Sequence, residues 1–170
     1  MLTLLAAGIA MVGVASVAVA SGGPNNRFAA ELLDAHNRAR SHDGVPPLDW
    51  NPALAQQARR WAQVLASEGQ MRHASQADRA GAGENLWMGS AGAYSASVMV
   101  NAFVDEKRHF KPGKFPHISR TGNWRDVGHY TQVIWQGTRE VGCAVAKGER
   151  DDFLVCRYWP AGNVFGEEIG

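Results

Sequence analysis

The feature that most constrains the fold is a pair of strand-like segments, each carrying one of the chain's two cysteines. They are VGCAVAK (141–147) and DFLVCRYW (152–159), and a turn around 148–151 can join them as a hairpin. Placing Cys143 opposite Cys156 also pairs Val145 with Leu154, Val141 with Tyr158 and Lys147 with Asp152. All four pairs lie on one face because side chains alternate along a strand, and the last pair joins opposite charges. The sequence therefore predicts an antiparallel hairpin in this register.

The same register predicts a disulfide between Cys143 and Cys156. Residues directly opposite in an antiparallel pair bring their Cβ atoms close enough for this bond. The alternative, two adjacent free thiols, is typical of a reducing compartment. Because the closed loop is short, we expect the bond to contribute about 2–3 kcal/mol to stability.

The first residues predict that the chain is exported. The segment 1–20, MLTLLAAGIAMVGVASVAVA, carries no charged side chain and ends in small residues at the positions that a signal peptidase reads. An apolar segment of this length could also span a bilayer, so a retained N-terminal anchor is the alternative. We therefore expect a cleaved signal peptide at 1–20, a linker at 21–26 and a secreted or periplasmic domain over 27–167.

Apolar side chains recur at helical spacing in three stretches before the hairpin, so the sequence predicts three helices. These are 27–40, the stretch from the Asn51 cap to Gly69, and 95–109. Asn followed by Pro is a typical helix start, and Gly is a typical end. Between the second and third helices, ENLWM (84–88) is typical of a short strand. The Pro- and Gly-rich stretch 111–124 indicates a long surface loop.

Two carboxylates stand out because they occupy apolar faces of predicted elements. Glu106 shares a helical face with Met99 and Phe103, in a stripe that also includes Val98 and Ala102. Glu84 shares a strand face with Leu86 and Met88 if 84–88 is a strand. A carboxylate that faces the interior must find a partner or change its pKa. Each could instead lie at a solvated edge or turn, and the pattern leaves both alternatives open.

Composition and motifs exclude several classes of function. The formal net charge is +1, so overall charge gives no reason to expect a nucleic-acid partner or an anionic membrane. The sequence lacks HExxH, CxxC, glycine-rich nucleotide-binding motifs and GxSxG. A cysteine nucleophile is not expected, because both cysteines are in the predicted disulfide. Six histidines remain as candidates, none in a local metal motif: His36, His42, His73, His109, His117 and His129.

Five stretches together resemble the CAP superfamily, which groups cysteine-rich secretory proteins, antigen 5 and pathogenesis-related 1 proteins. They are GHYTQVIWQGT (128–138), FLVCRYWPAGNVFGE (153–167), LLDAHNRARSHDGVPPLDWNPALAQQARRWA (32–62), RHAS (72–75) and GENLWMG (83–89). The resemblance covers about 27–167. It implies an α+β fold, a three-layer α-β-α sandwich with a small, mostly antiparallel sheet, in which His129 opens a short helix.

The resemblance also implies a cleft lined by two histidines and two glutamates. Carried over residue by residue, these are His73 in RHAS, Glu84 in GENLW, Glu106 in the third helix and His129 in GHYTQ. Two neutral imidazoles can hold a divalent ion such as zinc, with carboxylates and water completing or orienting the shell. Such a site is weak and open to solvent. The alternative is a structural network in which the four side chains hold one another's charge.

Three functions remain open. The family's association with sterol and fatty-acid binding implies a monomeric binding module with a metal-capable cleft and a nearby groove for a lipid-like or small hydrophobic ligand. The second possible function is a weak hydrolase or protease that uses a metal or Ser75, although no oxyanion hole can be named. An envelope protein that binds a partner through exposed tryptophans, with a purely structural tetrad, is the third. The sequence favours binding over catalysis.

Overall fold

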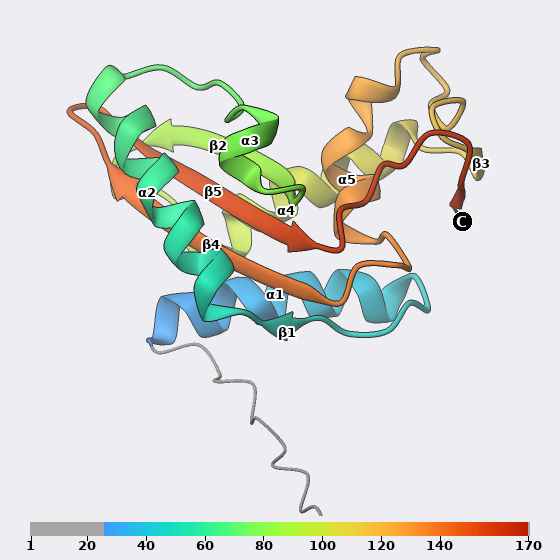
Figure 1. Cartoon of the computed structure of the whole chain (residues 1–170), viewed down its shortest axis with the longest axis horizontal. Coiled ribbons are helices and arrows are strands. Elements are labelled where there is room, and N and C mark those ends of the chain that lie inside the picture. Colours follow the sequence, from blue (N-terminus) through green and yellow to red (C-terminus); the bar gives the residue numbers. More distant parts are fainter. Residues whose placement is uncertain (1–25, 170) are drawn as a thin grey trace, which may run out of the picture.

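The computed structural model describes residues 26–169, so the expected signal peptide at 1–20 and most of the linker at 21–26 lie outside the described residues. A four-stranded sheet lies between helices in three layers (Figure 1), as expected for an α+β sandwich. Its strand order is β1 (Asp49–Trp50), β4 (Glu140–Lys147), β5 (Asp151–Trp159) and β2 (Gly83–Ser90). Only β1 runs parallel to its neighbour, and the other pairs are antiparallel.

The C-terminal hairpin has the predicted register. Strands β4 and β5 pair Cys143 with Cys156, and the other three expected pairs also stand opposite one another. The two cysteines form a disulfide, and no described cysteine is free. The hairpin was predictable because its register depends on local alternation and one turn.

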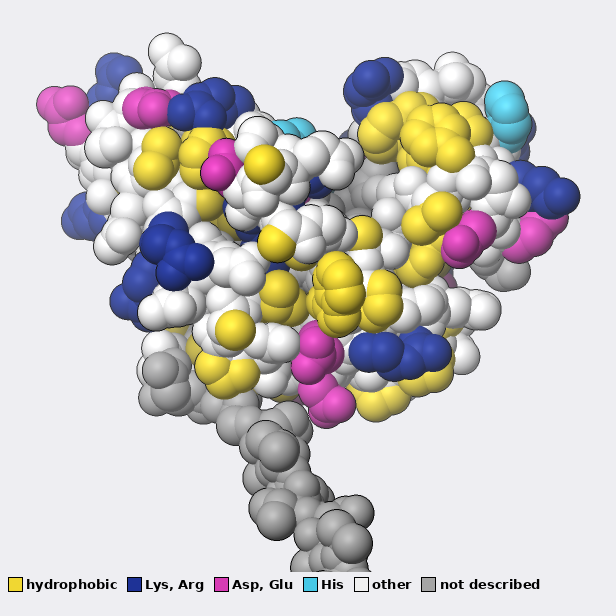
Figure 2. Space-filling model, viewed as in Figure 1, with side chains coloured by type: hydrophobic (Ala, Val, Ile, Leu, Met, Phe, Trp, Pro, Cys, Tyr) yellow, Lys and Arg dark blue, Asp and Glu magenta, His cyan; other side chains and the backbone are white. Residues whose placement is uncertain are grey.

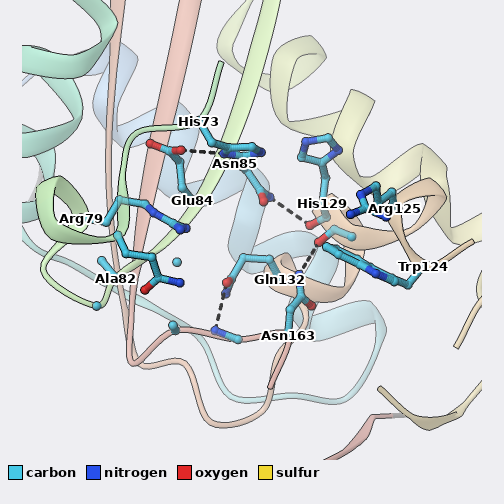
Figure 3. Close-up of a pocket in the computed structure, with 16 residues that line it drawn as sticks. His73, Arg79, Ala82, Glu84, Asn85, Trp124, Arg125, His129, Gln132 and Asn163 are labelled. Carbon is cyan, nitrogen blue, oxygen red and sulfur yellow. Dashed lines mark hydrogen bonds and ion pairs between the residues drawn. The ribbon is translucent and has the colours of Figure 1, made fainter. Parts of the chain in front are cut away.

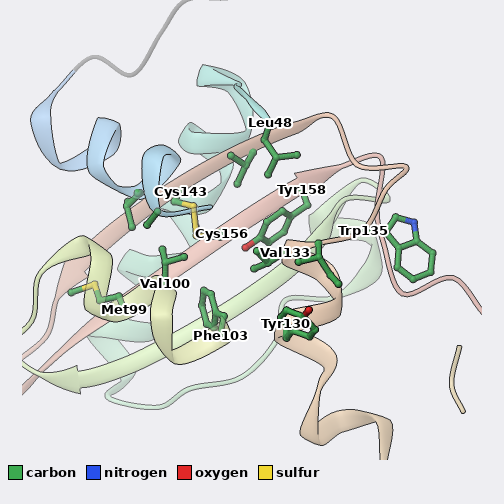
Figure 4. Packing of buried hydrophobic residues seen from close by; sticks show 14 of the residues in the cluster. Leu48, Met99, Val100, Phe103, Tyr130, Val133, Trp135, Cys143, Cys156 and Tyr158 are labelled. Carbon is green, nitrogen blue, oxygen red and sulfur yellow. A yellow bond between two sulfur atoms is a disulfide. The ribbon is translucent and has the colours of Figure 1, made fainter. Parts of the chain in front are cut away.

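Helices cover both faces of the sheet. Helices α1 (Arg27–His42), α4 (Ala96–Val104) and α5 (Gly128–Val133) lie on one face, and α2 (Pro52–Glu68) lies on the other. The short α3 (Gln76–Arg79) follows α2. Figure 4 shows the larger core, in which Met99, Val100 and Phe103 of α4 pack near the disulfide and Tyr158.

Helix α2 starts and ends as its sequence predicts. The Asn51 side chain accepts hydrogen bonds from the amides of Ala53 and Leu54, and Gly69 ends the helix in the left-handed conformation (φ 65°). The N-terminus of α2 lies directly on β4 at Gly142. A Cβ atom on Gly142 would lie 2.2 Å from the backbone nitrogen of Ala55, so only glycine permits this approach.

The third predicted helix begins and ends where expected, but it changes type along its length and part of its predicted apolar face is exposed. The α-helix ends at Val104 and continues as the 3-10 helix η1 (Asp105–His109), which carries Glu106. Val98 and Ala102 are exposed, whereas Met99 and Phe103 are buried together with Val100. Apolar residues surround most of this helix, so periodicity alone did not identify the face that packs on α1.

The stretch 111–124 is not the plain surface loop that its composition indicated. Phe115 and Ile118 are buried, and β3 (Gly113–Lys114) pairs with β6 (Glu168–Ile169) in a second, two-stranded sheet. The Phe115 ring contacts Trp124, Trp135 and Phe165. The segment is ordered by the returning C-terminal chain, a long-range contact that local composition does not reveal.

A buried arginine ties α1 to the turn that follows α5. Arg40 is fully buried and donates to the backbone carbonyl oxygens of Pro46, Val133, Trp135 and Thr138. Burial lowers the pKa of Arg40 to about 10, so the side chain stays charged at neutral pH. These hydrogen bonds compensate the cost of burying the guanidinium.

The described surface carries charges of both signs. Figure 2 shows Lys and Arg dispersed among Asp and Glu on the face in view. Trp159 is the one tryptophan among the exposed large hydrophobic residues of the described part, so there is no tryptophan patch for a protein partner. Within residues 26–169, no helix combines the length and apolarity needed to cross a membrane.

Candidate metal and ligand cleft

A cleft of about 580 Å³ opens between the start of β2 and α5. One wall carries His73, Arg79 and Glu84, and the opposite wall carries His129 with Arg125 (Figure 3). The lining residues come from three parts of the chain that are distant in sequence: 73–85, 124–132 and 161–163. The fold therefore assembles the cleft by bringing the end of β5 and the helix α5 against β2.

On the first wall, Glu84 holds His73. The Nδ1 atom of His73 lies 2.6 Å from Oε1 of Glu84, and the amide of Ala74 donates to the same oxygen at 3.1 Å. The Glu84 side chain is fully buried, whereas the His73 side chain is 56% exposed. The inward-facing alternative for Glu84 is therefore the one that the structure shows.

Arg157 lies behind Glu84 and neutralises it. Its Nη2 atom is 3.1 Å from the second oxygen of Glu84, because the two residues stand opposite each other on β5 and β2. Burial lowers the pKa of Arg157, and the charge of Glu84 acts in the opposite direction. A buried carboxylate needs such a partner, because an unpaired charge in the interior is strongly unfavourable.

On the second wall, Glu106 holds His129. The Nδ1 atom of His129 lies 2.6 Å from Oε1 of Glu106. The other carboxylate oxygen accepts from the backbone amides of His129 and Tyr130, at 2.9 and 3.2 Å, at the start of α5. The imidazole also stacks on Phe103, with ring centroids 5.2 Å apart. Glu106 therefore fixes both the helix start and the orientation of the ring.

The four sequence-predicted residues thus form two imidazole–carboxylate pairs. A carboxylate accepts at each Nδ1, so the hydrogen-bond network assigns the ring proton of neutral His73 and His129 to Nδ1. The Nε2 atoms then carry lone pairs, and no hydrogen bond joins either Nε2 to another described residue. Both rings line the cleft.

The carboxylates lie behind the imidazoles rather than beside them. Among residues 26–169, a single set of three His, Cys, Asp or Glu donors lies within 4.8 Å: His36, Cys143 and Cys156. Both of those sulfurs are in the disulfide, so they are not thiolate ligands. The cleft tetrad is not such a compact set, and the donors that it presents are the two imidazole nitrogens.

Gln132 forms part of the cleft floor and was not identified from the sequence. Its Oε1 accepts from the amide of Gly162 at 2.9 Å, and its Nε2 donates to the hydroxyl of Thr138 at 3.3 Å. A Cβ atom on Gly83 would lie 2.2 Å from that Oε1, so the glycine leaves room for this side chain. Arg79, Arg125 and Asn163 were missed as well, because no periodic pattern marks them.

Ser75 is engaged elsewhere. Its hydroxyl donates to the carboxylate of Asp78 at 2.6 Å and accepts from the Asp78 amide at 3.1 Å, as the N-cap of α3. The Nδ1 atom of His73 contacts Glu84, not this hydroxyl. A serine nucleophile needs a base within hydrogen-bonding reach, and the described geometry gives Ser75 none.

Comparison with known proteins identifies the family. The model of the cysteine-rich secretory protein family, CAP, matches residues 33–158. Pathogenesis-related protein 1B of Nicotiana tabacum is 38% identical over 139 residues, which is 81% of this chain and 77% of the relative. Glioma pathogenesis-related protein 1 of Mus musculus is 32% identical and aligns with 82% of this chain and 55% of its own length.

Solved structures show the same fold. The crystal structure of NaASP2 with Zn²⁺ superposes with a TM-score of 0.73 at 25% identity, and the match covers 86% of this chain and 88% of that one. BmVAL-1 matches with a TM-score of 0.69 at 22% identity, over 86% of this chain and 85% of its own. The family model, the relatives and the fold agree, and the chain belongs to the CAP family of cysteine-rich secretory proteins.

Proposed function

We propose that the domain is an exported binding module whose cleft holds a divalent metal ion, with zinc as the best fit, between His73 and His129. The observation that carries this proposal is the pairing of each Nδ1 with a carboxylate, at 2.6 Å in both cases. Histidines that ligate metals usually donate their other ring N–H to a carboxylate or carbonyl group. The arrangement leaves both Nε2 atoms available in a solvent-open cleft.

The donor set fits zinc better than a harder cation. Imidazole nitrogen suits zinc, whereas Mg²⁺ and Ca²⁺ prefer oxygen ligands. Two protein nitrogens leave the remaining positions to water or a ligand, so the expected affinity is lower than that of a closed structural site. A zinc ion would supply a positive centre for polar ligand groups. NaASP2, a structural relative, was solved with Zn²⁺, which supports the same reading for this chain.

Calorimetric zinc titration of the domain from residue 21 tests the proposal. The His73→Ala/His129→Ala double variant should lose binding while it stays folded. His117 is exposed and outside the cleft, so His117→Ala is a matched control that should bind zinc as the wild type does. Equal zinc binding by the double variant and the control would contradict the proposal. If the wild type, the double variant and the control all fail to bind zinc, the four side chains form a structural network and not a metal site.

Binding is favoured over catalysis in this cleft. A hydrolase that uses Ser75 would need an oriented base, and that hydroxyl is engaged with Asp78. The proposal includes export, and one relative, 32% identical, is named Secreted protein RBT4 of Candida albicans. That the domain is a monomer, and that no nucleic acid binds it, stay predictions.

A second candidate function is binding of a lipid-like ligand in a groove on the other side of α5. This groove has a volume of about 380 Å³. Its apolar lining comes from Val45, Phe110, Pro112 and Ile134. Arg120 adds positive charge, whereas Lys107 forms a salt bridge with Asp43, which also lines the groove. An apolar groove with a cationic side chain suits a fatty acid, which has an apolar chain and an anionic end.

Titration with a fluorescent fatty acid tests this groove. We expect Ile134→Asp to weaken binding at least tenfold, because it places a carboxylate among apolar groups and near the anionic end of the ligand. Val98 is exposed on α4 and does not line the groove, so Val98→Asp is the matched control. Unchanged affinity in a folded Ile134→Asp variant would rule the groove out.

A further inference from the structure

We propose that the cleft also binds an anionic ligand, a carboxylate or a phosphate ester, whose acidic group is held by Arg79 with Arg125 on the opposite wall. Both arginines line the cleft, Arg79 at the end of α3 and Arg125 in the 3-10 helix η2 (Trp124–Asp126). Figure 3 shows them on opposite sides of the cavity. Neither side chain takes part in the metal proposal.

The lining of the cleft has more positive than negative charge. Glu84 is the one carboxylate among the lining residues, and Arg157 neutralises it from behind at 3.1 Å. Its Oε1 atom is further occupied by His73 and the Ala74 amide. No salt bridge within 4.0 Å joins Arg79 or Arg125 to a carboxylate of residues 26–169. Two guanidinium groups therefore face the cavity without an internal counter-ion.

A buried donor on the Arg79 wall points to the same conclusion. The Nε atom of Arg79 is buried and has no hydrogen-bond partner in the described structure. Arg157 lies behind this wall and does not line the cleft, so its unpaired Nε and Nη1 atoms, next to the unpaired Oε2 of Glu84, do not belong to the cleft lining. Buried donors are normally satisfied, so the unpaired Nε of Arg79, a residue that lines the cleft, indicates an absent acceptor. An oxyanion offers several acceptor oxygens and opposite charge.

The opposite wall is less constrained. Arg125 is exposed and lies over the Trp124 ring, with its guanidinium carbon 5.0 Å from the ring centroid. Its charge is screened more by solvent than that of half-buried Arg79. We therefore assign the main contact to Arg79 and a supporting role to Arg125. Asp78, also on α3, binds the Ser75 hydroxyl and is exposed.

The size of the cavity favours an organic anion over a small inorganic ion. A volume of about 580 Å³ lies within the range of small-molecule sites. Carboxylates and phosphate monoesters both present at least two oxygens to which a guanidinium can donate a pair of parallel hydrogen bonds. The ligand therefore presents one acidic group to Arg79 and fills the remaining space with a body of moderate size.

Calorimetry on protein stripped with EDTA, at low ionic strength, tests the inference without the metal. Inorganic phosphate and succinate are the probes, and glycerol is the neutral control. We expect Arg79→Gln to weaken binding of the better probe at least tenfold and Arg125→Gln a few-fold. Arg60 is exposed on α2 and away from the cleft, so Arg60→Gln makes the same charge change and should bind as the wild type does.

Tighter binding of phosphate would indicate a phosphate ester, and tighter binding of succinate an organic acid; both support the inference. It is overturned if wild-type protein binds neither probe at 10 mM, roughly the weak end of specific binding. Equal affinities of Arg79→Gln and Arg60→Gln would also overturn it. If Arg79→Gln is unfolded, Arg79→Lys can be used instead. It keeps the positive charge but loses the paired donors of the guanidinium, so its affinity for the better probe should be below that of the wild type. Unchanged zinc binding by Arg79→Gln separates this inference from the metal proposal.

Discussion

At the scale of single residues, the hydrogen bonds on Nδ1 determine what the cleft histidines can do. Glu106 accepts from the Nδ1 of His129 and from two backbone amides, so it orients the ring and the helix together. Replacing it with Gln keeps an acceptor oxygen but removes the charge. We expect Glu106→Gln to weaken zinc binding about 10–100-fold.

Calorimetry on Glu106→Gln and on the control Glu149→Gln, which changes an exposed residue outside the cleft, measures this effect. The control should bind as the wild type does. If Glu106→Gln also binds zinc with wild-type affinity, the carboxylate does not orient a ligand, and its role is to cap α5.

A second prediction concerns a buried histidine outside the cleft. His36 is fully buried, with Nδ1 2.7 Å from the Leu32 carbonyl oxygen and Nε2 2.8 Å from the Tyr158 hydroxyl. Burial lowers its pKa to about 4, with a smaller contribution from Arg40. Between pH 6.5 and 4 the unfolded chain binds a proton that the folded chain does not, so stability falls as the pH falls.

The free energy of unfolding should fall by about 3 kcal/mol over this pH interval, because each pKa unit of difference corresponds to about 1.4 kcal/mol. Urea unfolding at several pH values measures it. His36→Gln should be less stable at pH 7 but should show a flatter decline between pH 6.5 and 4. Parallel curves for the two proteins would contradict the assignment of this pH dependence to His36.

At the scale of helices and strands, the sequence pattern predicted an element correctly where the contacts that form it are between residues close in sequence. The β4–β5 hairpin and the caps of α2 were predicted because adjacent residues determine them. The buried face of α4 was predicted only in part, and the packing of 111–124 was not, because they depend on α1 and on the returning C-terminal chain. Apolar residues on several sides of one helix do not identify the side that is buried.

The disulfide gives a prediction at this scale. It closes a loop with a sequence separation of 13, so the Cys143→Ala/Cys156→Ala variant should lose about 2–3 kcal/mol of unfolding free energy. Urea unfolding measures the loss. A reductant should destabilise the wild type by a similar amount and leave the variant unchanged. Equal midpoints for oxidised wild type and variant would show that the hairpin does not depend on the bond.

At the scale of the whole molecule, the cleft is a product of topology. Sequence pattern singled out Glu84 and Glu106, but it left open whether either faced inward. Their place in one cleft with His73 and His129 was implied only by the family resemblance, and the two pairs were found in the folded chain. Arg79 was found only in the folded chain, because it lines the cleft from α3, a four-residue helix that no sequence pattern predicted. A site built from distant segments leaves little local signal in any one of them.

In the proposed metal site, two imidazoles with oriented Nε2 atoms hold a zinc ion in an otherwise open coordination shell. X-ray absorption at the zinc edge of the loaded domain tests this most directly. We expect scattering from two imidazole nitrogens at about 2.0–2.1 Å, with oxygen from water or ligand in the other positions. A shell without imidazole scattering, or one that persists unchanged in the His73→Ala/His129→Ala variant, would contradict it.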